Sequence, residues 1–169
     1  MKITRRESLV MMGGAAAAAT GLGAPLHAES HSEGPVVHEV QMLNVHPENK
    51  RERQVFVPDL IRAQPGDTIR FLATDRGHNS EVNDKMMPNG GTEWAGKINQ
   101  EVEVTINVEG AYGFECKPHA SAGMVGLILV GDVSGNYYDL KKARQRGKAK
   151  QRFESLFERA DALLAEETA

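Results

Sequence analysis

The chain holds only one cysteine, Cys116, among its 169 residues. One thiol excludes an intramolecular disulfide, a four-cysteine zinc or iron–sulfur site, a binuclear copper–thiolate centre and covalent haem attachment, since each of these needs two or more cysteines. Any chemistry that uses this thiol must therefore combine it with side chains of other kinds.

Neither sign of charge dominates the sequence. With 20 basic and 23 acidic residues the formal charge is −3, and no stripe rich in lysine and arginine indicates a nucleic-acid surface. Long uncharged runs are missing outside the N-terminus, which excludes a polytopic membrane protein. Glycine and proline are scattered, which excludes collagen and low-complexity disorder. The length and composition of the chain are those of about one ordinary globular domain.

The one long uncharged run lies near the N-terminus, after Arg5 and Arg6 and before the small residue Ala28. This order predicts a cleavable signal peptide over residues 1–28, export to the periplasm, and a mature domain of residues 29–169. The arginine pair favours a twin-arginine signal, with a general secretory signal and a retained anchor as alternatives. Because the signal holds three basic residues and one acidic residue, the mature domain would carry a formal charge of −5.

Short apolar stretches separated by turn residues extend from Val36 to Val130. Alternation of apolar and polar residues, or a short apolar run, predicts strands at 36–43, 55–57, 68–72, 101–107, 113–116 and 124–130. Sequences such as Pro65-Gly66-Asp67 suit the tight turns between them. Many short strands at such spacing predict an all-β protein, a β-sandwich.

A helical tail is expected over residues 136–165. Asn136, with Asp139 three residues later, is predicted to cap a short helix that Gly147 ends. A second, amphipathic helix follows, in which the apolar positions are Phe153, Leu156, Phe157, Ala160, Leu163 and Leu164. Its polar side is not strongly basic, so we expect it to cover one face or edge of the sandwich and not a membrane surface.

Three metal-binding side chains, Cys116, His119 and Met124, fall within nine residues between two predicted strands. A fourth, His78, lies upstream. Taken singly, the cysteine and methionine would be ordinary core residues and the histidines ordinary polar residues. Two imidazoles, a thiolate and a weak axial thioether together are the donors of a blue-copper site, so the combination predicts one copper ion bound by these four residues.

This donor set suits electron transfer. Thiolate and imidazole ligands accommodate both Cu(II) and Cu(I), and a rigid scaffold that holds one geometry for both states limits rearrangement. Pro118 has no backbone N–H and cannot donate a hydrogen bond to the Cys116 sulfur, which affects the reduction potential.

Several segments closely resemble the pseudoazurins of the cupredoxin family. They are His78-Asn79, Lys97-Ile98-Asn99, Gly110-Ala111-Tyr112, Cys116-x-Pro118-His119-x₄-Met124 and Gly131-Asp132. The resemblance implies a Greek-key β-sandwich of about eight strands with two C-terminal α-helices. It also implies a monomeric, periplasmic carrier of single electrons that receives them from an upstream donor and commonly passes them to copper nitrite reductase or another denitrification reductase.

The chain departs from the pseudoazurin pattern at Lys117. A hydroxyl residue often stands there and bonds to the asparagine after the first histidine ligand, so Asn79 must find another acceptor or use the backbone. Glu93 and Glu115 stand close to where lysines would surround His119, and electrostatic steering of a partner is therefore expected to be weak.

An apolar docking surface is expected around His119 instead. Its predicted members are Pro118, Ala120, Met42, Met86 and Met87, of which the methionines could equally belong to the core. Trp94 could simply pack in the core. Three other histidines, His31, His38 and His46, have no ligand-like context and are expected to be strand or solvent-facing residues.

Two other classes of function are alternatives to an electron carrier. A copper-trafficking protein without a dedicated redox partner would more often show clusters of methionine or cysteine on flexible segments. A thiol enzyme with Cys116 as nucleophile and His119 as base would have no use for Pro118 and Met124. The sequence therefore predicts an electron carrier, not an enzyme.

Overall fold

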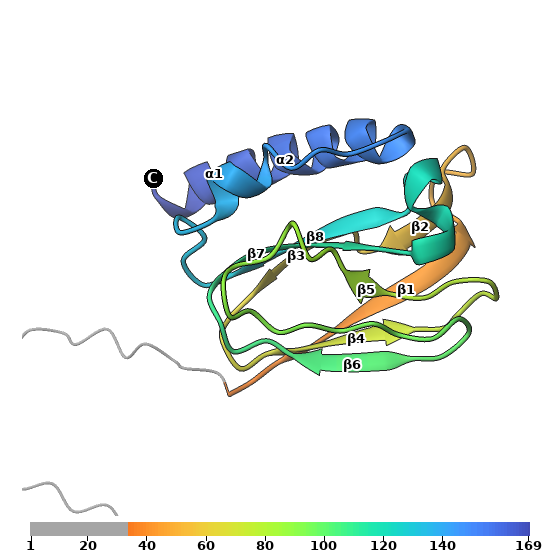
Figure 1. Cartoon of the computed structure of the whole chain (residues 1–169), viewed down its shortest axis with the longest axis horizontal. Coiled ribbons are helices and arrows are strands. Elements are labelled where there is room, and N and C mark those ends of the chain that lie inside the picture. Colours follow the sequence, from red (N-terminus) through yellow and green to blue (C-terminus); the bar gives the residue numbers. More distant parts are fainter. Residues whose placement is uncertain (1–33) are drawn as a thin grey trace, which may run out of the picture. The chain divides into compact units, whose positions relative to one another are not determined.

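Eight strands form two four-stranded sheets in the computed structural model, which describes residues 34–169 (Figure 1). The predicted signal peptide and His31 lie outside the described residues. The first sheet has the order β2 (Arg53–Val57), β1 (Val37–Val45), β4 (Thr68–Leu72), β6 (Val102–Thr105). The second has the order β3 (Leu60–Ala63), β8 (Val125–Val130), β7 (Gly110–Glu115), β5 (Glu81–Val82).

Both sheets are mixed. Strand β1 pairs antiparallel with β2 and parallel with β4, and β8 pairs parallel with β3 and antiparallel with β7. The all-β, eight-stranded sandwich predicted from the sequence is confirmed. All six predicted strand segments are present, whereas β3 and β5 were not identified, because four residues and two residues are too short to show a clear period.

Strand β8 is buried at every position, which explains why it lacks polar residues. Ile128 and Val130 face the core between the sheets, together with Phe56, Phe71 and Phe114. Leu127 and Leu129 belong to a second apolar cluster, which the C-terminal helix covers. Because neighbouring residues of a strand point to opposite faces, only an apolar run can satisfy both layers.

Two helices follow the sandwich, α1 (Tyr137–Leu140) and α2 (Lys148–Glu167). Helix α2 lies over the second sheet, where it packs against β8 (Figure 1). Its predicted apolar stripe faces this sheet, with Phe153 and Leu156 fully buried. Burial of a side chain of this size contributes about 1.5–3 kcal/mol. The prediction that this helix covers one face of the sandwich is confirmed. Within residues 34–169, no helix has the length and apolar character required to cross a bilayer.

Asn136 is the N-cap residue of α1, as predicted, but the expected side-chain cap is wrong. Its side chain makes no capping hydrogen bond to α1. Instead, Oδ1 accepts the backbone N–H of Ala111 and Nδ2 donates to the carbonyl oxygen of Ala111, both at 2.8 Å. Asn136 thus ties the start of the helical tail to β7, a long-range pairing that outweighs a local cap.

Candidate copper site

The candidate ligand loop connects β7 to β8. Cys116 follows the last residue of β7, His119 lies in a short 3₁₀ helix, η1 (Lys117–Ala122), and Met124 precedes β8. Three backbone hydrogen bonds close the loop. They run from His119 N–H to Cys116 O at 2.9 Å, from Cys116 N–H to Met124 O at 3.0 Å, and from Met124 N–H to His119 O at 3.1 Å. The sequence places the loop correctly but does not reveal its helical turn.

Local residue choices account for this turn. Pro118 stands in the first turn of η1, where its fixed φ suits a helix and its missing N–H has no acceptor to lose. Gly123 ends the turn with φ of 99°, a left-handed conformation that glycine adopts without strain. Proline and glycine thereby fix both ends of the segment that carries His119.

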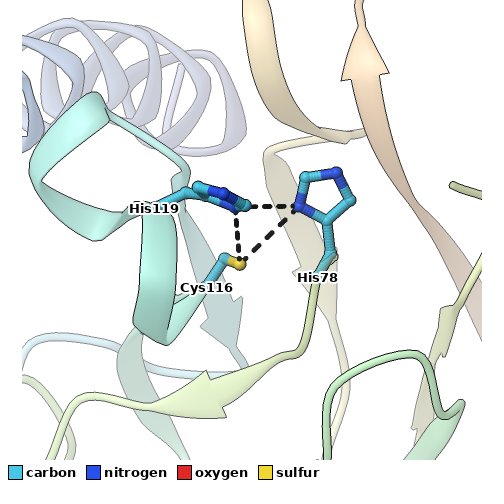
Figure 2. Close-up of side chains that lie close together, drawn as sticks. All are labelled: His78, Cys116 and His119. Atoms are coloured by element: carbon cyan, nitrogen blue, oxygen red, sulfur yellow. Dashed lines mark hydrogen bonds between the residues drawn. The ribbon is translucent and has the colours of Figure 1, made fainter. Parts of the chain in front are cut away.

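Three donor atoms converge between this loop and the segment before β5 (Figure 2). The Nδ1 atoms of His78 and His119 lie 3.1 Å apart. The Sγ atom of Cys116 lies 3.8 Å from Nδ1 of His78 and 3.5 Å from Nδ1 of His119. These three side chains are the one group of histidine, cysteine and acidic residues within residues 34–169 that is placed to hold a metal ion.

The size of this triangle matches a metal ion. A point equidistant from three atoms with these separations lies roughly 2 Å from each, close to the ~2.0–2.1 Å and ~2.3 Å typical of metal–imidazole and metal–thiolate bonds. The donors are two nitrogens and one soft sulfur, the set that suits copper. The residues present therefore fit a copper ion.

The orientation of His78 is set by Asn44. The Nε2–H of His78 donates to Oδ1 of Asn44 at 3.1 Å, which assigns the proton to Nε2 and leaves the lone pair of Nδ1 directed at the donor group. Burial, and then the proximity of His119, lower the pKa of His78. Both effects favour the neutral imidazole that a metal ion requires.

The thiol of Cys116 is fully buried, and burial raises its pKa. Hydrogen bonds from the backbone N–H groups of Asn79 and His119 act in the opposite direction. A cation bound by the thiol offsets the cost of burying a thiolate, since coordination removes the thiol proton. Free Cys116 is therefore a protonated core residue, whereas the metal-bound form is the thiolate.

Met124 is also fully buried and belongs to the same core cluster as Cys116. Its backbone bonds to both Cys116 and His119 keep it beside the ligand group. The four residues that the sequence predicts as ligands therefore lie in one region of the fold, with Cys116 directly before η1 and Met124 directly before β8.

Asn79 meets the expectation that it uses the backbone. Its Oδ1 accepts the backbone N–H of Lys117 at 2.8 Å, and its Nδ2 donates to the carbonyl oxygen of Gly96 at 3.0 Å. Since Asn79 follows His78 and Lys117 follows Cys116, the first bond ties the two candidate ligand segments together.

Two methionines expected near the docking surface lie inside the protein instead. Met42 and Met86 are fully buried and belong to the two apolar clusters, so they offer no surface to a partner. Met87 is half-buried against the core. Met42 packs in the core between the sheets, and Met86 packs in the second cluster, which α2 covers. Pro118 is exposed and Ala120 half-exposed, as an apolar surface beside His119 requires.

Ile98 is an apolar surface residue that the sequence analysis did not single out for docking. Its side chain is 52% exposed, although a large apolar side chain usually avoids water. The adjacent Asn99 donates its backbone N–H to the carbonyl oxygen of His78 at 2.9 Å. The available sequence signal was an isolated isoleucine in a polar stretch, and its proximity to His78 comes only from the fold.

The remaining described histidines have structural partners, as expected of non-ligands. Nε2 of His38 lies 2.9 Å from Oδ2 of Asp67. Nδ1 of His46 accepts the backbone N–H groups of Glu48 and Asn49. The side chain of Trp94 packs on Phe71 in the core, with ring centroids 5.8 Å apart.

Basic side chains gather beside η1. A hollow of about 580 Å³ is lined by Lys85, Lys117, Arg144 and Arg146, with Glu115 as its acidic residue, and it reaches Ala120 and Ser121 next to His119. The two arginines come from the segment between α1 and α2. Both arginines are distant in sequence from the ligand loop, so no local pattern predicts them beside it.

A two-sheet sandwich with a His₂Cys group, buried except at one histidine, defines the cupredoxin class of copper-binding proteins. Residues 43–131 match the family of copper-binding proteins that includes plastocyanin and azurin. This match covers more than half of the chain and includes three of the donor side chains in the candidate ligand loop, Cys116, His119 and Met124, as well as His78.

Comparison with similar proteins identifies the family within the cupredoxin class. Pseudoazurin of Paracoccus pantotrophus is 39% identical over 141 residues, which are 83% of this chain and 90% of that protein. Pseudoazurin of Methylorubrum extorquens AM1 is 41% identical over 118 residues, 70% of this chain and 78% of that protein. A solved pseudoazurin structure from Sinorhizobium superposes with a TM-score of 0.69 and 40% identity, covering 72% of this chain and 94% of that one.

The chain belongs to the pseudoazurin family. It is accordingly a blue-copper electron carrier with one copper ion as its cofactor, it works with redox partner proteins, and it is not an enzyme. The alternative of a thiol enzyme is thereby excluded.

Proposed function

We propose that His78, Cys116 and His119 hold the copper ion and that Met124 supplies the weak axial thioether. The convergence of two Nδ1 atoms and one Sγ atom within 3.8 Å of one another carries this assignment. Complete burial of Met124, and its backbone bonds to the loop, support the fourth ligand.

The bound copper ion supplies a centre that accepts one electron from a reduced donor and passes it to an oxidised acceptor. The chain provides rigidity around it. Asn44 fixes the ring of His78, and the three backbone bonds of the ligand loop fix Cys116 and His119. Because both segments are anchored in the sandwich, the donor atoms need to move little between oxidation states, and the barrier to transfer stays low.

His119 is the candidate exit for the electron. Among the three converging ligands it alone is not fully buried, whereas His78 and Cys116 have no exposed surface. Exposed Pro118 and half-exposed Ala120 flank it in η1, which favours contact with an apolar partner surface. Small, weak interfaces of this kind suit rapid exchange between redox partners.

The protein acts in the periplasm in this proposal. Export rests on the sequence of residues 1–28, in which charged, apolar and small residues follow one another in the order of a signal peptide. N-terminal sequencing of the exported protein should begin near Glu29. A sequence that still contained Lys2 would contradict this assignment.

The proposed acceptor is copper nitrite reductase or another denitrification reductase, supplied through this carrier by an upstream donor. The basic hollow beside His119 favours an acceptor whose docking surface is acidic. Stopped-flow mixing of the reduced protein with a panel of periplasmic reductases identifies the acceptor as the enzyme with the largest second-order rate. Equal, slow rates with every denitrification reductase would contradict the assignment.

Two substitutions test the ligands. Cys116→Ser removes the thiolate and should abolish the intense visible absorption of the copper-loaded protein. Met124→Gln keeps an axial donor and should retain the colour with a shifted reduction potential. A serine variant that keeps the thiolate absorption would show that Cys116 is not a ligand.

A further inference from the structure

The two candidate ligand segments are joined one residue after each ligand. Oδ1 of Asn79, which follows His78, accepts the backbone N–H of Lys117, which follows Cys116, at 2.8 Å. This bond uses only the backbone of Lys117, so its side chain is available for a second connection.

Lys117 makes that connection to Glu81. Its Nζ lies 2.8 Å from Oε1 of Glu81, and Nδ2 of Asn79 lies 3.3 Å from Oε2 of the same carboxylate. Asn79, Glu81 and Lys117 therefore form a closed ring of interactions. The Glu81 side chain is 18% exposed and that of Lys117 is 71% exposed, which makes the carboxylate the anchored end of the pair.

The strand that carries Glu81 is short and places like charges opposite each other. Strand β5 contains only two residues and pairs with β7 in a register that sets Glu81 opposite Glu115. Like charges directly opposite each other destabilise a sheet. The Lys117 ammonium lies 2.8 Å from the Glu81 carboxylate and so balances one of these two charges. The lysine thus offsets the repulsion at the edge that leads back to His78.

We propose that Glu81 and Lys117 form a positioning pair that holds the His78 segment against the Cys116 segment. The proposal rests on the assignment of His78 and Cys116 as copper ligands. The pair acts through Asn79 and does not contact the metal.

The test compares Lys117→Met, Glu81→Gln and the double variant in which the two charges are exchanged, Glu81→Lys with Lys117→Glu. In metal-free protein, hydrogen exchange of the residue-117 amide, which bonds to Asn79, should accelerate about two- to fivefold in each single variant, as expected for loss of a partly exposed ion pair. In loaded protein, copper release to a chelator should accelerate by a similar factor. The charge exchange restores the ion pair but not the bond from Asn79 Nδ2, because an ammonium group cannot accept a hydrogen bond, so part of each loss should return.

A spectroscopic measurement separates positioning from general loosening. The shape of the visible absorption of the loaded protein should change in both single variants and return in the double variant. Lys97→Met is the matched control, since Lys97 is an exposed lysine two residues before Asn99, which bonds to the His78 carbonyl. This control should leave amide exchange, copper release and the spectrum unchanged.

Any one of three results would overturn the proposal. They are unchanged amide exchange in both single variants, an effect of Lys97→Met equal to that of Lys117→Met, and a double variant no better than the single ones. Failure of the ligand assignment would show differently, as a coloured Cys116→Ser variant, and it would leave the amide exchange result in metal-free protein intact.

Discussion

Gly147, the residue before helix α2, lies directly against the carbonyl oxygen of Ser121 in η1. A Cβ atom added at Gly147 would lie 2.6 Å from that oxygen, closer than real Cβ contacts allow. The helical tail and the turn that carries His119 therefore touch through backbone atoms. The tail is part of the support of the copper site as well as a cover for the second sheet.

Gly147→Ala should destabilise the protein and disturb the ligand loop. The residue has φ of 58° and ψ of −142°, a conformation that only glycine adopts readily, and a methyl group there would also push on Ser121. We expect a loss of about 1–3 kcal/mol in the free energy of unfolding of metal-free protein, measured in urea, and a shifted reduction potential of the loaded protein. Gly135→Ala is the control, because nothing lies within 4 Å of its added Cβ. Equal stabilities of the two variants would contradict the proposed contact.

Asn44 should control copper affinity through the ring of His78. Asn44→Leu removes the acceptor for Nε2–H, so the ring loses its fixed tautomer and orientation. Loss of such a partner typically lowers metal affinity about 10- to 100-fold, and competition with a chelator measures this. Asn44→Asp keeps an acceptor oxygen and should retain most of the affinity. If the leucine variant binds copper as tightly as the parent, Asn44 does not orient the ligand.

The proposed copper ligands could be grouped from the sequence because three of them share one loop. The spacing of Cys116, His119 and Met124 fixes their order around a single turn, and the pairing of donor types identifies the metal. The surface around them was not predictable in the same way. Alternation along β1 shows that residues alternate between faces, but whether Met42 faces a core depends on the second sheet, which comes from distant segments.

Contacts between distant segments explain the other differences. Asn136 bonds to Ala111, 25 residues away, and this pairing replaces the local cap that its sequence context favours. The basic hollow combines Lys85 with Arg144, which lie 59 residues apart in the sequence. Local sequence patterns report periodicity and turn preference, and they carry no information on such long-range pairs.

Asp67 should make the stability of the metal-free protein sensitive to acid. Burial alone would raise the pKa of this carboxyl group, but hydrogen bonds from the backbone N–H groups of Val36 and Gln64, together with His38, outweigh it and lower the pKa. Because the folded-state pKa lies below the unfolded value of about 3.9, this contribution is complete well above pH 4 and is lost as the pH falls through the folded-state pKa.

Asp67→Asn tests this dependence. At pH 7 the variant should lose roughly 1–3 kcal/mol, since its amide cannot satisfy all of the donors that face it. In urea unfolding of metal-free protein from pH 7 to pH 3, the difference between parent and variant should shrink toward acid. A difference that stays constant over this range would show that the charge of Asp67 does not contribute.

Docking of the redox partner should combine an apolar contact with one-sided electrostatic steering. The exposed Pro118 supplies part of the contact beside His119, and the hollow with Arg144 and Arg146 supplies positive charge on one side. Because Glu115 also lines this hollow, steering should be modest, as expected from the sequence. Charges of this kind mainly change the association rate and are screened by salt, whereas an apolar contact is not.

Electron-transfer rates with copper nitrite reductase across ionic strength separate the two contributions. The double variant Arg144→Gln with Arg146→Gln should react several-fold more slowly than the parent at low salt and match it near 1 M, where the Debye length is about 3 Å. Pro118→Glu should slow transfer at every ionic strength, because it places a charge in the apolar contact. Lys142→Gln, whose lysine already pairs with Asp139 at 2.9 Å, is the matched control and should resemble the parent. If the arginine variant equals the parent at low salt while Lys142→Gln is slow, the steering charge lies on the far side of the segment between α1 and α2, and the partner does not approach over the hollow.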